Sequence, residues 1–203
     1  MLLYDGGRAP NPRRVRIFLS EKGVDVPRKE IDMGALGHRS EEITSLNPLQ
    51  RLPVLELDDG AVLTESVAIC RYFEELHPDP PLMGVDAKDR AVVEMWNRRA
   101  EFHFLLPVAN AFRHTHKAME GWEVPQVPEY GEASRHKARE FMEFLDQELA
   151  DRPFIAGERF TIADITAMMA MDMLKPARMD RPIDLINLMR WYESVSSRPS
   201  AAA

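Results

Sequence analysis

The side chains best placed to do chemistry are the pair Glu65-Ser66, which directly follow a strand–turn–strand pattern. Residues 54–57 form a short apolar-rich segment, Asp59-Gly60 is a strong hairpin signal, and residues 61–63 return as a second strand. Pro53 precedes the first strand and removes a backbone donor, so we expect an open edge there. Free backbone on one side, with a carboxylate and a hydroxyl on the other, predicts a site for a small peptide.

The cysteine and two of the histidines indicate neither a metal site nor a reactive protein thiol. Cys70 is the single cysteine, which excludes an internal disulfide and a thiolate zinc cluster. It lies on the apolar face of a predicted helix, so we expect a buried, unreactive thiol. His114 and His116 are two residues apart. Residues at this spacing do not share a helix face, so we expect no metal site.

Composition limits the class of partner. The chain has 203 residues, 45% of them hydrophobic, 29% charged, and a formal net charge of −7. A negative balance argues against nucleic acid, because phosphate binding needs a basic face. The one basic cluster, Arg13-Arg14-Val15-Arg16, points in several directions on a helix, so we place it on a solvated or salt-bridged surface. We expect no signal peptide and no membrane span, and therefore a cytoplasmic protein.

The first part of the chain alternates strands and helices. Residues 2–4 and 27–32 read as strands, and they flank a helix at 13–22 that Gly23 ends. Residues 34–47 form a loop with a short helix. After the hairpin, apolar residues at helical spacing predict a helix over 65–76. The order βαβ followed by ββα predicts a thioredoxin-like domain, a four-stranded sheet with flanking helices.

The second part reads as helix alone. The proline-rich segment 77–81 breaks the pattern, and helices follow at 88–109, 131–149, 161–174 and 183–196. Thr161 and Asp164 form a pattern like a capping box at the start of the third. We therefore predict an α/β plus all-α protein, with a thioredoxin-like domain at 1–78, a linker at 79–86 and a helical bundle domain at 87–203.

Three segments in this order resemble the cytosolic glutathione transferases over nearly the whole chain. Residues 47–55 (Asn-Pro-Leu-Gln-Arg-Leu-Pro-Val-Leu) look like the segment around the family's cis-proline. Residues 65–69 (Glu-Ser-Val-Ala-Ile) look like its Glu-Ser-x-Ala-Ile signature, and residues 160–165 (Phe-Thr-Ile-Ala-Asp-Ile) like its capping motif. The branch it most resembles is a bacterial and fungal one that lacks the usual catalytic serine or tyrosine.

The resemblance implies a site for glutathione, the family's co-substrate. Leu52 would offer its backbone to the cysteinyl part, before a cis Pro53. Glu65 would pair with the γ-glutamyl ammonium and Ser66 with its carboxylate. His38 and Gln50 match positions that reach the glycyl carboxylate. Each of these residues also has a purely structural interpretation. His38 could be an exposed loop histidine, Gln50 could cap a turn, and Ser66 could be an ordinary first residue of a helix.

The resemblance also implies that the glutathione thiol is held as a thiolate, which is the nucleophile. Ala9 stands where many classes carry the catalytic serine or cysteine, and it has no donor. Asn11 resembles an asparagine that some bacterial members use to donate to the thiolate. Its alternative is a helix N-cap. Tyr4, either catalytic or merely packed, and a bound water are other candidates, and His114 matches a histidine of the atypical branch.

The expected function is conjugation of glutathione to small hydrophobic electrophiles, a detoxification reaction. The alternatives are glutathione-dependent disulfide or peroxide reduction, and a non-catalytic binding protein. The resemblance further implies a homodimer. The electrophile pocket would come from the helical domain, with the following candidates: Phe102, Leu105, Leu106, Phe112, Met119 and Trp122.

Overall fold

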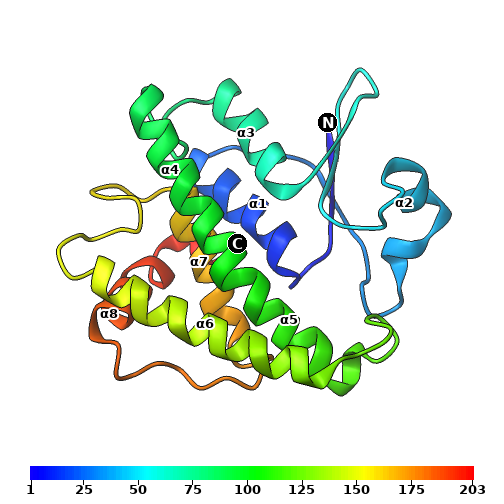
Figure 1. Ribbon diagram of the computed structural model, residues 1–203. Helices are drawn as coiled ribbons and strands as arrows, with labels where there is room; N and C mark the ends of the chain where they lie inside the picture. The colour runs from blue at the N-terminus through cyan, green and yellow to red at the C-terminus, as the bar shows by residue number, and fades with distance from the viewer. The chain divides into compact units, whose positions relative to one another are not determined.

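The computed structural model describes residues 1–203, which fold as two compact units (Figure 1). Unit 1 comprises Met1–Leu82 with Pro199–Ala203, and unit 2 comprises Met83–Arg198. The last five residues thus return to unit 1, whereas the predicted second domain ran to residue 203. The apolar character and length needed to cross a bilayer are found in none of the helices.

Unit 1 is built on a four-stranded mixed sheet. The strands are β1 (Leu2–Asp5), β2 (Arg28–Glu30), β3 (Val54–Glu56) and β4 (Val62–Thr64), in the order β2-β1-β3-β4. β1 pairs parallel with β2 and antiparallel with β3, and β4 pairs antiparallel with β3. This is the predicted thioredoxin-like arrangement. It places β3 inside the sheet, so the open edge expected at Pro53 is not a sheet edge.

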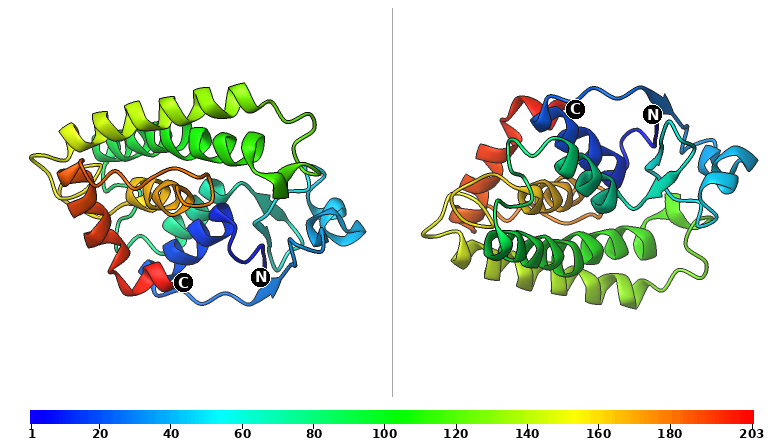
Figure 2. Two further views of the ribbon diagram at one scale, coloured as in Figure 1. Left: turned by 90° about the horizontal axis from the view of Figure 1, so that it is seen from below. Right: turned by 90° about the horizontal axis from the view of Figure 1, so that it is seen from above.

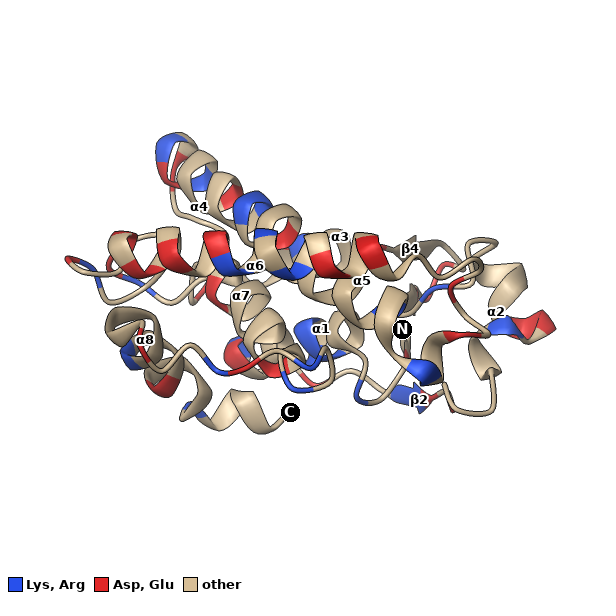
Figure 3. Ribbon diagram, turned by 60° about the horizontal axis from the view of Figure 1, so that its bottom comes forward, with Lys and Arg blue, Asp and Glu red and all other residues tan.

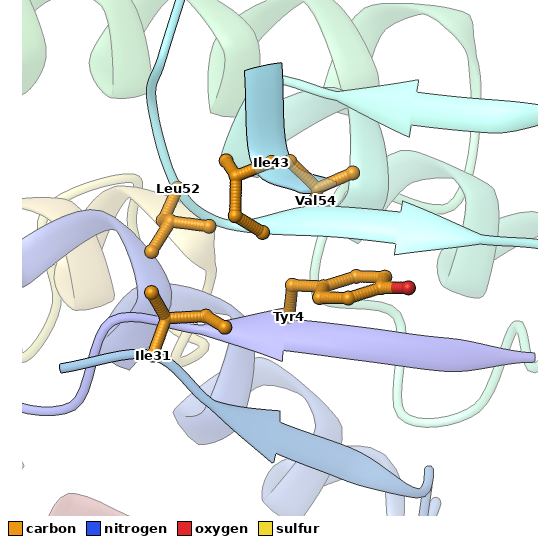
Figure 4. Packing of buried hydrophobic residues seen from close by; sticks show 5 residues of the cluster. All are labelled: Tyr4, Ile31, Ile43, Leu52 and Val54. Carbon is orange, nitrogen blue, oxygen red and sulfur yellow. The ribbon is translucent and has the colours of Figure 1, made fainter. Parts of the chain in front are cut away.

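Helices cover both faces of this sheet. Because successive strand residues point to opposite faces, Leu3 and Leu55 face away from Tyr4 and Val54. One face packs on α2 (Glu41–Leu46), where Ile43 joins the cluster formed by Tyr4, Ile31, Leu52 and Val54 (Figure 4). The helices α1 (Pro10–Lys22) and α3 (Ser66–Leu76) pack against each other.

The ends of these elements follow local sequence rules. Gly23 ends α1 in the left-handed conformation, with φ of 64°, as predicted. The β3–β4 hairpin turns at Gly60, with φ of 82°, and the Asp59 side chain accepts from Ala61 N–H at 2.9 Å. Between β2 and α2 lies a short 3₁₀ helix, Gly37–Arg39. The structure of residues 54–76 therefore agrees closely with the sequence pattern.

Unit 2 is entirely helical, with α4 (Ala87–Ala100), α5 (Leu106–Thr115), α6 (Pro128–Glu148), α7 (Ile162–Met173) and α8 (Ile186–Ser196). α6 lies along α5, as both views in Figure 2 show. A short 3₁₀ helix, Lys117–Met119, follows α5, and another, Pro199–Ala202, ends the chain in unit 1. Basic residues lie in the middle of α6 and acidic residues lie toward both of its ends (Figure 3).

The sequence predicts a single helix at 88–109. In the structure this helical segment is longer, and a π-helical turn interrupts it. A π-helical turn, Glu101–Leu105, separates α4 from α5, and α5 continues to Thr115. Hydrophobic spacing does not reveal such a turn, because it inserts only a small offset into a continuous helical pattern.

Asp164 anchors the core of unit 2 at the start of α7. Its Oδ1 accepts from Trp191 Nε1 at 2.8 Å and from Ile155 N–H at 2.9 Å, and its Oδ2 accepts from Thr161 N–H at 2.9 Å. The capping box expected from Thr161 and Asp164 is present. Burial raises the pKa of Asp164 more than these hydrogen bonds lower it.

Candidate functional site

The tip of α1 carries Asn11 in an exposed position. The helix begins at Pro10 with Ala9 as its N-cap residue, so the alternative reading of Asn11 as the N-cap is wrong. Pro10 and Pro12 have no N–H, and Arg13 N–H already donates to Ala9 C=O at 3.2 Å. The free donors at this helix end are therefore the backbone N–H and the side-chain amide of Asn11, which makes no hydrogen bond within the chain.

Tyr4 is not placed to activate a thiol at the tip of α1. Its side chain points to the α2 face of the sheet (Figure 4), and its hydroxyl donates to Glu56 Oε2 at 3.0 Å. Burial raises the pKa of Tyr4, and the carboxylate of Glu56 raises it further. A thiol-activating tyrosine needs the opposite environment, so Tyr4 is a packed, neutral side chain.

Leu52 lies two residues before β3 and close to the tip of α1. The Leu52–Pro53 bond is cis, as the resemblance implies. The backbone N–H and C=O of Leu52 pair with no other backbone group. A Cβ added at Gly6 would lie 3.3 Å from both Leu52 Cδ1 and Pro12 Cγ, so Gly6 lets these two elements meet. Unpaired backbone is thereby held next to the helix end that carries Asn11.

Gln50 and His38 belong to the segment around α2. Gln50 has a positive φ of 54° and its Nε2 donates to Thr44 Oγ1 at 3.2 Å. His38 is 1% exposed, so the expectation of an exposed loop histidine is wrong. Burial lowers the pKa of His38, and the charges of Arg39 and Arg51 lower it further. His38 is therefore neutral at pH 7.

Glu65 and Ser66 stand where β4 turns into α3. Glu65 is exposed and has φ of 65°, a conformation that is uncommon for a side chain other than glycine and often marks a functional turn. Ser66 is the first residue of α3 and is buried. The first turn of α3 contains no acidic residue, so its N-terminal amides and positive dipole end favour an anion.

Arg14 is a buried neighbour of Ser66 that the sequence analysis placed on the surface. It is 1% exposed and its Nη1 donates to Ser66 Oγ at 2.7 Å, so it does not lie on a solvated surface. The other two arginines of the cluster are also engaged: Arg16 holds both carboxylate oxygens of Asp5, at 2.6 and 2.8 Å, and Arg13 donates to Ala201 C=O. The available signal was that Arg14 precedes the buried Ile17 and Phe18 by one helical turn.

Cys70 takes no part in chemistry. It is fully buried in α3, and burial raises the pKa of its thiol to about 12. The predicted unreactive thiol is confirmed.

In unit 2, His114 holds the segment that follows α5. Its Nδ1 accepts from Val127 N–H at 3.1 Å, its Nε2 lies 3.8 Å from Glu123 Oε1, and its ring contacts the edge of Tyr130. His116 similarly accepts from Ala118 N–H. These contacts give both histidines a structural part within unit 2.

The residues expected to line an electrophile pocket differ in their exposure to solvent. Leu105 is buried in the core of unit 2, whereas Phe102 and Leu106 are 53% and 42% exposed. The half-buried members are Phe112, Met119 and Trp122.

Comparison with known proteins agrees with this geometry. Residues 9–76 match the family model for the N-terminal domain of glutathione S-transferase, and residues 101–199 match the model for its C-terminal domain. Glutathione S-transferase 2 of Saccharomyces cerevisiae is 35% identical, covering 98% of this chain and 87% of its own length.

Two solved structures extend the similarity to the fold. The crystal structure of Gtt2 from Saccharomyces cerevisiae has a TM-score of 0.94 and 34% identity, covering 100% of this chain and 99% of its own. A glutathione S-transferase domain-containing protein from Marinobacter aquaeolei VT8 has a TM-score of 0.93 and 37% identity, covering 98% and 99%.

A thioredoxin-like unit with this hairpin, followed by a helical unit, is the architecture that the matched glutathione S-transferase models and structures share. The chain belongs to the glutathione S-transferase family, whose co-substrate is glutathione.

Proposed function

We propose that this transferase activates glutathione with Asn11 and conjugates it to small hydrophobic electrophiles. The observation that carries the proposal is the tip of α1, where Ala9 supplies no donor and Asn11 supplies two groups free to donate. A thiolate placed there would accept from the Asn11 amide and lie at the positive end of a helix.

Glutathione would lie along unit 1 in an extended conformation. The backbone of Leu52 would pair with the cysteinyl part, as a strand does at unpaired backbone. Glu65 would pair with the γ-glutamyl ammonium, and Ser66 would bind the carboxylate at the N-terminus of α3. Gln50 and the neutral His38 would serve the glycyl end, as hydrogen-bond donors rather than as charges.

The energetic requirement is modest. A free thiol has a pKa near 8.5, and lowering it by two units takes roughly 2.7 kcal/mol. One hydrogen bond to a charged group supplies about 1.5–3 kcal/mol. The thiol proton leaves to solvent as the thiolate forms. The thiolate then attacks the electrophilic carbon and a sulfur–carbon bond forms; the displaced electron pair departs with the leaving group of the electrophile or, in an addition, takes up a proton from solvent. Asn11 thus accounts for the activation with no serine or tyrosine.

The first test is the pKa of the enzyme-bound glutathione thiol, followed by thiolate absorbance as pH is varied. We expect the wild type to titrate well below 8.5. Asn11→Ala removes the side-chain donor and keeps the helix, so we expect the pKa to rise by about one to two units.

Asn11→Ser is the matched control, because it keeps a donor at the same position and should retain part of the shift. An unchanged pKa in Asn11→Ala would contradict the assignment of Asn11. A wild-type enzyme that binds no glutathione at millimolar concentration would contradict the proposed function as a whole.

We also propose that the enzyme is a homodimer that acts in the cytoplasm on reactive electrophiles, as the family suggests. An aromatic groove on unit 2 supports the dimer. It is a surface pocket of about 390 Å³ lined by Phe102, Pro107, Phe141 and Phe144. Lys137 and Glu140, one turn apart on α6, border it and would pair with their opposites across a two-fold axis.

A further inference from the structure

Arg14 places a buried charge behind the γ-glutamyl subsite. Its guanidinium is 1% exposed on α1 and donates to Ser66 Oγ at 2.7 Å. A buried charge is costly unless hydrogen bonds and neighbouring groups compensate it, and the hydrogen bond to Ser66 Oγ is one such contact.

The hydrogen bond from Arg14 fixes the direction in which the Ser66 hydroxyl can donate. A serine hydroxyl has one proton to donate and two lone pairs that accept. Arginine only donates, so Arg14 occupies a lone pair and leaves the Ser66 proton for another acceptor. Ser66 Oγ has no other partner within the chain. The hydroxyl is thus oriented as a donor, and the adjacent positive charge strengthens it.

We propose that Arg14 is a positioning residue that makes the subsite at Ser66 select a carboxylate. It would act through Ser66, by holding the hydroxyl as a donor and by strengthening that donor with its charge, at the N-terminal end of α3, where no acidic residue lies in the first turn. The inference rests on the proposed function, because it concerns the carboxylate of the γ-glutamyl group.

The test compares two unreactive ligands. One is S-methylglutathione, and the other is the same peptide with the γ-glutamyl α-carboxylate replaced by hydrogen. We expect the wild type to bind the first about 10- to 100-fold more tightly, the range for a hydrogen bond to a charged group. Arg14→Met should bring this ratio close to one while changing the affinity for the second ligand little.

Further variants separate positioning from general damage to the fold. Arg14→Lys keeps the charge and should keep part of the ratio. Ser66→Ala should reduce the ratio, and adding Arg14→Met to it should reduce the ratio no further, because both changes remove one coupled interaction. Ser66→Thr, which retains the hydroxyl, should keep the ratio and serves if Arg14→Met fails to fold.

Equal loss of affinity for both ligands in Arg14→Met, or independent effects of the Arg14 and Ser66 changes, would overturn the inference. A wild-type enzyme that binds both ligands equally would also overturn it and leave the proposed function standing. Failure to bind S-methylglutathione at all would instead count against the proposed function.

Discussion

Burial of His38 couples the stability of unit 1 to pH. In the native state the pKa of His38 is lowered, chiefly because burial disfavours the charged imidazolium. In the unfolded chain the pKa returns to about 6.5. Between the native pKa and 6.5 the unfolded state binds more protons, so the free energy of unfolding decreases as pH falls through that window.

The measurement is the urea midpoint of unfolding at pH 7.5 and pH 5.5. We expect the wild type to lose more stability between these values than His38→Gln, which has no proton to gain at this position. His136→Gln, on the exposed surface of α6, is the control and should behave as the wild type does. Equal losses in wild type and His38→Gln would contradict the burial argument.

The conformation and burial of the site residues could be predicted from the sequence for some residues and not for others. Glu65-Ser66 and Pro53 lie in short patterns whose backbone conformation is local, and the structure has the turn and the cis bond there. Arg14 was assigned to a solvated or salt-bridged surface because the arginines of its cluster point in several directions on a helix. In the structure it is buried and donates to Ser66, 52 residues away, and no local pattern records that contact.

Whole helices and strands were easier to predict than their ends and joints. The apolar repeat of α3 and the glycine after α1 indicate those helices directly. Asn11 shows the limit: it was a candidate N-cap residue before Pro12, and the helix began at the earlier proline, Pro10. The order of strands and helices along the chain predicted a thioredoxin-like domain, whereas the position of β3 inside the sheet depends on long-range pairing.

The crossing of α5 and α6 depends on Gly131. A Cβ there would lie 2.4 Å from Thr115 Cγ2 and 3.3 Å from His114 Cβ. Thr115 has little freedom to rotate, because its hydroxyl donates to Ala111 C=O and accepts from Arg135 Nη2 at 2.8 Å. We expect Gly131→Ala to reduce the free energy of unfolding by about 1–3 kcal/mol, the usual effect of overpacking.

Gly121→Ala is the matched control, since a Cβ at Gly121 meets nothing within 4 Å. Urea unfolding of the two variants beside the wild type would measure the difference. If Gly131→Ala were as stable as Gly121→Ala, the close approach of the two helices would not be required.

The proposed dimer makes a prediction for the molecule as a whole. Phe102 and Phe144 are 53% and 37% exposed at the groove on unit 2, which is unusual for phenylalanines in a surface cluster without a partner. If a second copy covers them, Phe102→Ser combined with Phe144→Ser should raise the dimer dissociation constant by at least about a hundredfold. Truncating a buried interface aromatic typically costs about 2 kcal/mol or more.

Light scattering coupled to size exclusion at micromolar concentration would distinguish monomer from dimer. Ile183→Ser is the control, because Ile183 is 80% exposed, equally apolar and outside the groove. We expect Ile183→Ser to remain dimeric and the double variant to be monomeric, with both keeping helical circular dichroism. A double variant that stays dimeric would show that the interface lies on another surface. A wild type that is monomeric would contradict the proposed dimer.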